Sequence, residues 1–175
     1  MFLKKLLYID RGVSNFTSLF STYTEPYCES GMTLAFWVRL LRGEENRDGY
    51  VRIIGQASDG HGGISIWIKP YLSKACFYIE LDVHKWRCCF YNIPNDLYRQ
   101  WLFLSMSLDP APLSKMVCFM NKKRVTRGIL SGTSSGPTSQ FFAGDRGKFL
   151  LDDILYLPKF SNDEMISSFF NKSKF

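Results

Sequence analysis

Apolar and polar residues alternate with a period of two over most of the chain. This alternation is typical of strands that turn one face to a core and the other to solvent. Each alternating run is short and is bounded by Gly, Pro, Asn, Asp or Ser, which are the residues that favour turns. Strands at this spacing, roughly ten to twelve in all, predict an all-β sandwich or barrel. The residues that we expect at its buried centre are Leu34, Phe36, Val38, Ile64, Ile66, Phe77, Ile79, Leu102, Leu104, Ile154 and Tyr156.

One segment near the C-terminus changes to a helical period. Ser161 and Glu164 have the spacing of a capping box, in which the serine caps the first turn and the glutamate reaches back. Ile166, Phe169 and Phe170 then recur at the spacing of one helix face. The sequence therefore predicts one short helix that begins near Ser161 and is capped by its hydroxyl.

A hairpin in the middle of the chain has a register that the side chains themselves favour. A two-residue turn at Asp82 and Val83 places opposite charges, an aromatic and a cation, and two cysteines directly across from one another. A slip of one residue would move Phe77 and Ile79 to the charged face, which the apolar pattern disfavours. The pairs on the polar face are Glu80 with Lys85, Tyr78 with Arg87 and Cys76 with Cys89.

Composition narrows the class of protein further. With 175 residues, 46% hydrophobic and 22% charged, the chain fits one globular domain, and we expect residues 1–175 to form it. No apolar stretch reaches the length of about 18 residues that a transmembrane helix needs. The net charge of +6 comes from scattered basic residues without a dense run, so nucleic acid is not an expected partner.

Five segments follow one another along the chain: Leu7–Gly12, Met32–Leu40, Trp101–Ser105, Met116–Val125 and Phe142–Tyr156. Their order resembles that of the concanavalin A-like lectin/glucanase superfamily, in its laminin G-like or pentraxin-like branch. The resemblance covers nearly the whole chain and rests on the order and spacing of the segments rather than on any one of them. It departs from the family at Lys122 and Lys123, where glycine is usual after Asn121. The resemblance implies an all-β fold, a two-sheet antiparallel sandwich (a jelly roll) with one short C-terminal helix.

Glycoside hydrolases of this superfamily carry three acidic residues on one strand of a sheet. Glu80 and Asp82 match the first two of these acids by position, but the third carboxylate is missing. Retaining hydrolysis needs two carboxyl groups at a set separation, one as nucleophile and one as acid and base. We therefore expect no catalytic residues and no enzyme activity, with a glycoside hydrolase as the most distant alternative.

The resemblance also implies that calcium is the metal to consider. Laminin G-like domains often hold one Ca²⁺ at a loop rim through Asp or Asn side chains and backbone carbonyls. The candidate oxygens in this sequence are those of Asp59, Asp109 and Asp145, which do not form a dense acidic cluster. We expect no cofactor and no metal, and calcium bound by these residues is the alternative.

These observations favour a binding module that recognises a glycan or a protein surface. We expect it to belong to an adhesion, receptor or matrix protein and to lie outside the cell or on its surface. A bridge between Cys76 and Cys89 and two glycosylation sequons favour this setting. The expected ligand-binding residues are Trp67, Tyr78, Glu80, Lys85 and Arg87, together with Asp59 and His61 of a glycine-rich loop.

An intracellular interaction module is the second interpretation. Large trafficking proteins of the BEACH type carry a concanavalin A-like domain with a similar order of strands. An N-terminus without the apolar core of a signal peptide, and an odd number of cysteines, five in all, favour this cytoplasmic alternative.

Overall fold

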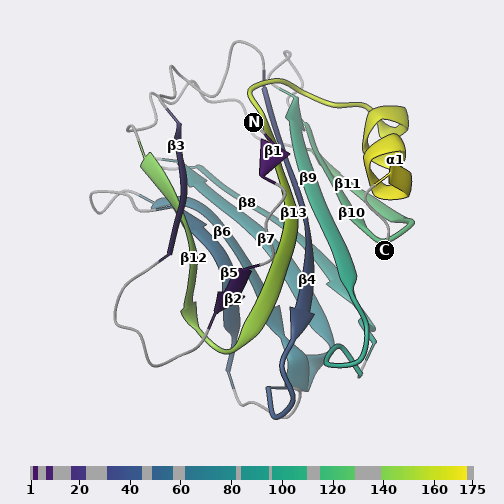
Figure 1. Cartoon of the computed structure of the whole chain (residues 1–175). Coiled ribbons are helices and arrows are strands. Elements are labelled where there is room, and N and C mark those ends of the chain that lie inside the picture. Colours follow the sequence, from purple (N-terminus) through teal and green to yellow (C-terminus); the bar gives the residue numbers. More distant parts are fainter. Residues whose placement is uncertain are drawn as a thin grey trace.

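The protein forms two antiparallel sheets that face each other, with one helix on the outside (Figure 1). A computed structural model describes residues 2–3, 7–9, 17–22, 31–44, 49–56, 62–81, 84–94, 96–109, 115–128 and 139–172. The predicted fold class, an antiparallel two-sheet sandwich with a short C-terminal helix, is confirmed. In the part of the chain that the structure describes, no helix is long and apolar enough to span a membrane.

The first sheet has seven strands in the order β1-β13-β4-β9-β10-β11, with β2 also paired to β13. Every pairing in this sheet is antiparallel, so neighbouring strands run up and down alternately. Its strands are β1 (Phe2–Leu3), β2 (Leu7–Ile9), β4 (Met32–Leu40), β9 (Leu102–Asp109), β10 (Lys115–Met120), β11 (Lys123–Gly128) and β13 (Phe149–Leu157).

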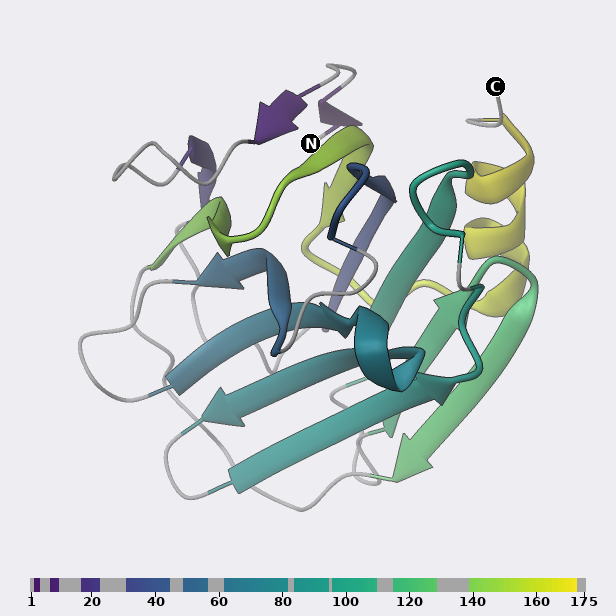
Figure 2. The ribbon, with the colours of Figure 1, turned by 90° about the horizontal axis from the view of Figure 1, so that it is seen from below.

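The second sheet has six strands in the order β3-β12-β5-β6-β7-β8, again antiparallel throughout. A short 3-10 turn, η1 (Pro70–Leu72), joins β6 to β7. The view from below shows the two curved sheets stacked, with α1 (Asp163–Lys172) on the far side of the first sheet (Figure 2). The strands are β3 (Thr17–Thr22), β5 (Val51–Gln56), β6 (Gly62–Lys69), β7 (Lys74–Leu81), β8 (His84–Tyr91) and β12 (Ser139–Arg146).

The main core lies between the two sheets and is built from the inward positions of both. Each sheet contributes alternate residues, as a pleated strand requires. Nine of the predicted core residues are buried, and the side chains of Ile64 and Ile79 lie outside the described residues. The nine are Leu34, Phe36, Val38, Ile66, Phe77, Leu102, Leu104, Ile154 and Tyr156.

A second, smaller core lies on the opposite face of the first sheet, beneath α1. Trp37 of β4 and Phe103 of β9 are paired across the two strands and are almost fully buried. Phe170 of the helix covers them, with ring centroids 5.3 Å from Trp37 and 5.2 Å from Phe103. Strand β4 is therefore buried on both faces, in keeping with its uninterrupted apolar run Leu34–Val38.

The helix is capped by Asn162, and the predicted cap at Ser161 is wrong. The Asn162 side-chain oxygen accepts the N–H of Met165 at 3.0 Å, which is the bond that an N-cap residue makes with the third helical residue. Ser161 is buried one position earlier, where its backbone N–H donates to the Ser107 hydroxyl at 2.8 Å. Ser161 and Asn162 are neighbours, and either side chain could cap the helix. Because the Ser161 backbone is bound to Ser107 of β9, Asn162 is the residue left to cap it.

Replacing Asn162 with alanine should lower the free energy of unfolding by about 1 kcal/mol, the usual cost of losing an N-cap. Ser161→Ala is the matched control, because the Ser161 hydroxyl makes no hydrogen bond within the described part of the chain. Urea denaturation followed by far-UV circular dichroism measures both values. A larger loss for Ser161→Ala than for Asn162→Ala would show that the cap is assigned to the wrong residue.

Candidate functional site

The hairpin of β7 and β8 has the register that the sequence predicts. Tyr78 lies opposite Arg87, Glu80 opposite Lys85, and Cys76 opposite Cys89. Strand β6 pairs with the other edge of β7, and β5 pairs with β6, so cross-strand neighbours continue from β8 to β5. Trp67 pairs with Cys76 across β6 and β7, and Arg52 of β5 pairs with Trp67.

These residues share the outer face of the second sheet, which points away from the core. Their chain neighbours Ile66, Ile68 and Phe77 are completely buried between the sheets, so the alternate positions face outward. Arg87 and Tyr91 are exposed there. We call this surface the outer basic face and define it by Tyr50, Arg52, Trp67, Lys69, Lys74, Arg87 and Tyr91.

Aromatic rings hold the cations of the outer basic face in place. The Nζ atoms of Lys69 and Lys74 lie 5.3 and 5.9 Å from the centroid of the Trp67 ring. Lys74 also lies 4.9 Å from the Tyr91 ring centroid. Such contacts attract an ammonium group to the negative face of the ring while its outer side stays in water. Tyr50 continues the array, with its ring centroid 6.3 Å from Trp67 and 6.0 Å from the Arg52 guanidinium carbon.

Lys69 and Lys74 are directly opposite each other at the end of the β6–β7 hairpin. Like charges in this position destabilise an antiparallel pair. Both side chains are half-buried against the same Trp67 ring, so they cannot simply diverge into solvent without losing that contact. An acidic group bound over the pair would offset the repulsion, and the arrangement therefore suits an anionic ligand.

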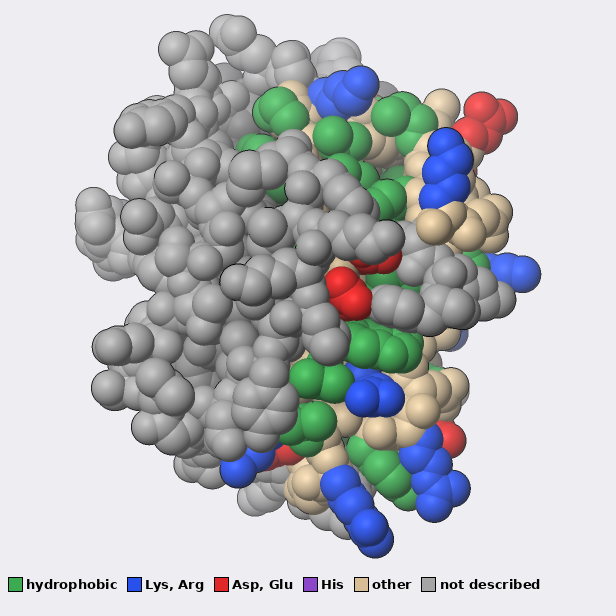
Figure 3. All heavy atoms as spheres, in the orientation of Figure 1, with side chains coloured by type: hydrophobic (Ala, Val, Ile, Leu, Met, Phe, Trp, Pro, Cys, Tyr) green, Lys and Arg blue, Asp and Glu red, His purple; other side chains and the backbone are tan. Residues whose placement is uncertain are grey.

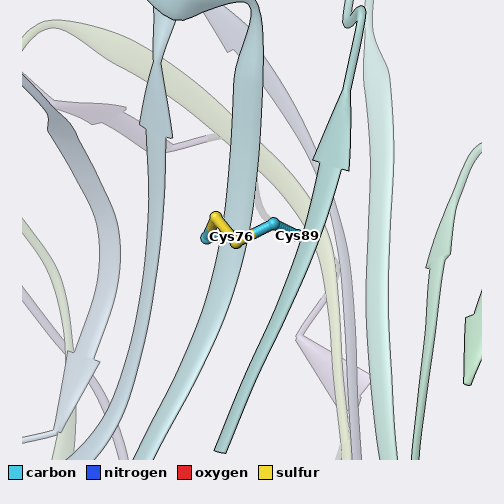
Figure 4. The surroundings of a disulfide bond; sticks show 2 residues. All are labelled: Cys76 and Cys89. Atoms are coloured by element: carbon cyan, nitrogen blue, oxygen red, sulfur yellow. A yellow bond between two sulfur atoms is a disulfide. The ribbon is translucent and has the colours of Figure 1, made fainter. Parts of the chain in front are cut away.

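A disulfide joins Cys76 to Cys89 across the middle of this surface (Figure 4). The two residues come from the neighbouring strands β7 and β8, and their Cα atoms are 4.2 Å apart. Both cysteines are buried although they belong to the outward-facing positions. Cys88 and Cys118 are buried thiols of the main core. The covalent link stiffens the hairpin that carries Lys74 and Arg87.

The structure describes only part of the predicted site. Tyr78, Glu80 and Lys85 occupy the predicted register positions, but their side chains lie outside the described residues. The loop with Asp59 and His61 lies wholly outside them. The interactions of the outer basic face involve five residues that are not among the expected ligand-binding residues: Tyr50, Arg52, Lys69, Lys74 and Tyr91. The sequence does hold a signal for the two lysines. Lys69 is two positions from Trp67 and so faces the same side of β6, and Lys74 pairs with Lys69 across the turn that begins at Pro70.

The three predicted calcium candidates belong to different segments. Asp109 is the last residue of β9, and Asp145 lies in β12 of the other sheet. Asp59 lies outside the described residues. Within the described ranges, no group of three or more His, Cys, Asp or Glu side chains is placed to hold a metal ion.

No known protein-family model matches the sequence, and no curated protein matches it in sequence either. Solved structures of botulinum neurotoxin receptor-binding domains are similar to it in fold. The mosaic serotype C/D domain has a TM-score of 0.68 at 12% identity, covering 83% of this chain and 37% of that chain. A type C structure comes from a toxin described as needing two ganglioside molecules to enter cells. It has a TM-score of 0.66 at 16% identity, and the match covers 89% of this chain and 37% of that chain.

A third similar structure is the binding domain of botulinum neurotoxin DC in complex with rat synaptotagmin II. It has a TM-score of 0.64 at 19% identity, and the match covers 82% of this chain and 36% of that one. The chain thus spans little more than a third of the domains that it matches. Likeness at this low identity establishes a shared β-sandwich fold.

Proposed function

We propose that this chain is a non-catalytic binding module that recognises a glycan or a protein surface through the outer basic face. The observation that carries the proposal is the pair of opposed lysines, Lys69 and Lys74, held on the Trp67 ring. Such a pair weakens the hairpin in isolation and becomes favourable when an acidic group binds over it. Arg52 of β5 and Arg87 of β8 lie on the strands that flank β6 and β7. They widen the positive surface, so that it can contact more than one acidic group of a ligand.

An anionic glycan fits this surface best. Its acidic groups would pair with the ammonium and guanidinium groups, and its sugar faces would pack on the exposed Tyr91 ring. The neurotoxin domains that share the fold support this proposal, because they include complexes with SialylT and with rat synaptotagmin II, and a type C toxin whose cell entry depends on two ganglioside molecules. A protein ligand with an acidic surface is the second candidate, favoured by the same cations.

Hydrolysis of the glycan is not part of the proposal. Glu80 lies opposite Lys85 in the β7–β8 register, and no second acid faces it across this hairpin. Asp82 follows β7 and lies outside the described residues, and the sequence has no third acid at the position that the hydrolases use. Strand β7, which carries Glu80, is instead joined to β8 by the Cys76–Cys89 disulfide.

We also propose that residues 1–175 form one module of the laminin G-like branch of the concanavalin A-like superfamily. The two-sheet sandwich with a C-terminal helix and the order of the five sequence segments support this assignment. The Cys76–Cys89 disulfide supports an extracellular or cell-surface setting, since disulfides persist in oxidising compartments. Counting thiols on protein isolated from its native compartment separates this setting from a BEACH-type intracellular scaffold, in which all five cysteines would be reduced.

The opposed lysines give the sharpest test of the binding face. The double variant Lys69→Gln/Lys74→Gln should weaken binding to heparin, a sulfated polysaccharide, by about ten-fold or more, since each exposed charge pair contributes up to about 1 kcal/mol. Isothermal titration at two salt concentrations should also show a shallower salt dependence for this variant, because fewer cations remain to be screened.

Arg87→Ala should weaken heparin binding less, about two- to five-fold, because it removes a single exposed cation. Lys172→Gln, an equal charge change on α1, is the control and should leave affinity unchanged. Equal loss from Lys172→Gln would mean that net charge rather than this surface decides binding. A glycan-array screen of the unmodified protein would then identify the preferred acidic sugar.

A further inference from the structure

One end of the sandwich gathers several turns that bring basic side chains together. Here β4 ends, β6 turns into β7 through η1, and β8 passes to β9. The backbone N–H of Ile93 donates to the Ser73 carbonyl at 3.0 Å, which fastens the segment after β8 to the η1 turn. The β10–β11 turn joins the same end, because the Asn121 N–H donates to the Phe103 carbonyl at 2.9 Å. We call this region the turn end; it faces the reader in Figure 2.

The turn η1 carries adjacent large apolar side chains that point into solvent. Tyr71 is 73% exposed and Leu72 is 53% exposed. Pro70 begins the turn and the left-handed Ser73 closes it, with its N–H donating to the Pro70 carbonyl at 2.8 Å. Tyr71 and Leu72 are therefore exposed on a turn that is fixed by hydrogen bonds. The exposed Tyr91 ring lies close to Lys74, which follows the turn.

Cations surround this apolar apex. Lys69 and Lys74 flank η1 directly in sequence, and both are half-buried with their ammonium groups on aromatic rings. Among the described residues of the turn end, Asp96 is the exposed acidic side chain, while Glu44 is buried. Figure 3 shows Lys and Arg side chains at the lower edge of the molecule, beside hydrophobic ones. Further exposed cations of the turn end are Arg42, Arg99, Lys122 and Lys123.

We propose that the turn end docks on an anionic membrane surface, with Tyr71 and Leu72 entering the lipid interface and the surrounding cations contacting acidic headgroups. Tyrosine favours the interface between headgroups and acyl chains, and leucine gains from leaving water there. Lysine stems that lie along aromatic rings keep their ammonium groups at headgroup level. The cations come from four separate turns, which suits a diffuse layer of negative charge.

A membrane explains this combination better than a protein partner or a glycan. A stable protein interface buries about 800 Å² on each partner, whereas the apolar apex consists of one short turn. A sugar binds through hydrogen bonds and through stacking on aromatic rings, and the leucine side chain offers neither. Membrane binding requires only a small inserted apolar area when several cations add attraction to anionic lipid. The proposal shares Lys69 and Lys74 with the outer basic face but adds Tyr71 and Leu72, so a variant of these two residues tests it separately from the proposed function.

Vesicle sedimentation of the full chain tests the proposal. The protein should bind vesicles that contain phosphatidylserine in phosphatidylcholine, and bind vesicles of phosphatidylcholine alone far less. Tyr71→Ser/Leu72→Ser should lower the partition coefficient by about ten-fold or more, because two interfacial side chains are lost. Lys69→Gln should lower it by about five-fold, the effect of one cation near the surface.

Two variants control for generic effects. Met165→Ser removes an exposed apolar side chain of α1, and Lys159→Gln removes a cation beyond β13, so neither should change vesicle binding. Equal binding to both vesicle types, or full binding by Tyr71→Ser/Leu72→Ser, would overturn the proposal. Retained heparin binding without vesicle binding would do the same and would leave the glycan function intact. Arg87→Ala should retain vesicle binding while it weakens heparin binding.

Discussion

Replacing Phe103 with alanine is expected to lower the free energy of unfolding by about 3–5 kcal/mol, the range for a buried aromatic residue cut back to alanine. Phe103 is completely buried. Its ring centroid lies 5.3 Å from that of Trp37 and 5.2 Å from that of Phe170. The substitution therefore leaves a cavity between the first sheet and α1, and it removes three aromatic contacts at once, with Trp37, Phe170 and Phe169.

Guanidinium denaturation followed by tryptophan fluorescence measures this loss. Phe169→Ala is the comparison, because Phe169 touches the same ring at 5.9 Å between centroids but is only half-buried. We expect its cost to be clearly smaller. A loss below about 1 kcal/mol for Phe103→Ala would mean that the helix does not seal this face of the sheet.

Removing the disulfide is the second change with a large expected effect. Cys76→Ala/Cys89→Ala should lower the free energy of unfolding by about 3 kcal/mol, because the bond closes a short loop of the unfolded chain. The two cysteines are 13 positions apart in sequence. Reducing agent should lower the stability of the unmodified protein by a comparable amount and leave that of the double variant unchanged.

Binding separates a structural disulfide from one that shapes the ligand surface. Cys76 lies opposite Trp67, whose ring holds both Lys69 and Lys74. If the bond holds this arrangement, the double variant should bind heparin more weakly even under conditions where it remains fully folded. Unchanged affinity with lower stability would assign the bond to stability alone.

The strands and the hairpin register were predictable because their signals are local. Alternation at Leu34, Phe36 and Val38 identifies the inward face of β4 without knowledge of its neighbours. Only two residues separate the paired Leu81 and His84, which leaves few ways to pair the flanking segments, and matching charges and apolar residues in the sequence select one of them. The Cys76–Cys89 pairing follows from that register.

The binding surface was predictable only in part. Trp67 and Arg87 were found because they stand on the polar face of strands that the alternation had already identified. Lys69 and Lys74 carry the strongest electrostatic argument, yet lysines beside a turn are ordinary solvated residues in a sequence. Their significance depends on being opposite each other and on sharing one aromatic ring, which are properties of the folded sheet.

The sequence by itself determined the class of fold, the inward face of each recognised strand and the partners within the central hairpin, because each depends on neighbours close along the chain. Only the tertiary structure decided what covers the second face of β4 and β9. Trp37 and Phe103 are covered by a helix that begins at Asp163, far along the chain. The same docking buries Ser161 against Ser107 and leaves the cap to Asn162. The sequence of a strand indicates which side chains share a face. What covers each face depends on where a segment distant in sequence packs.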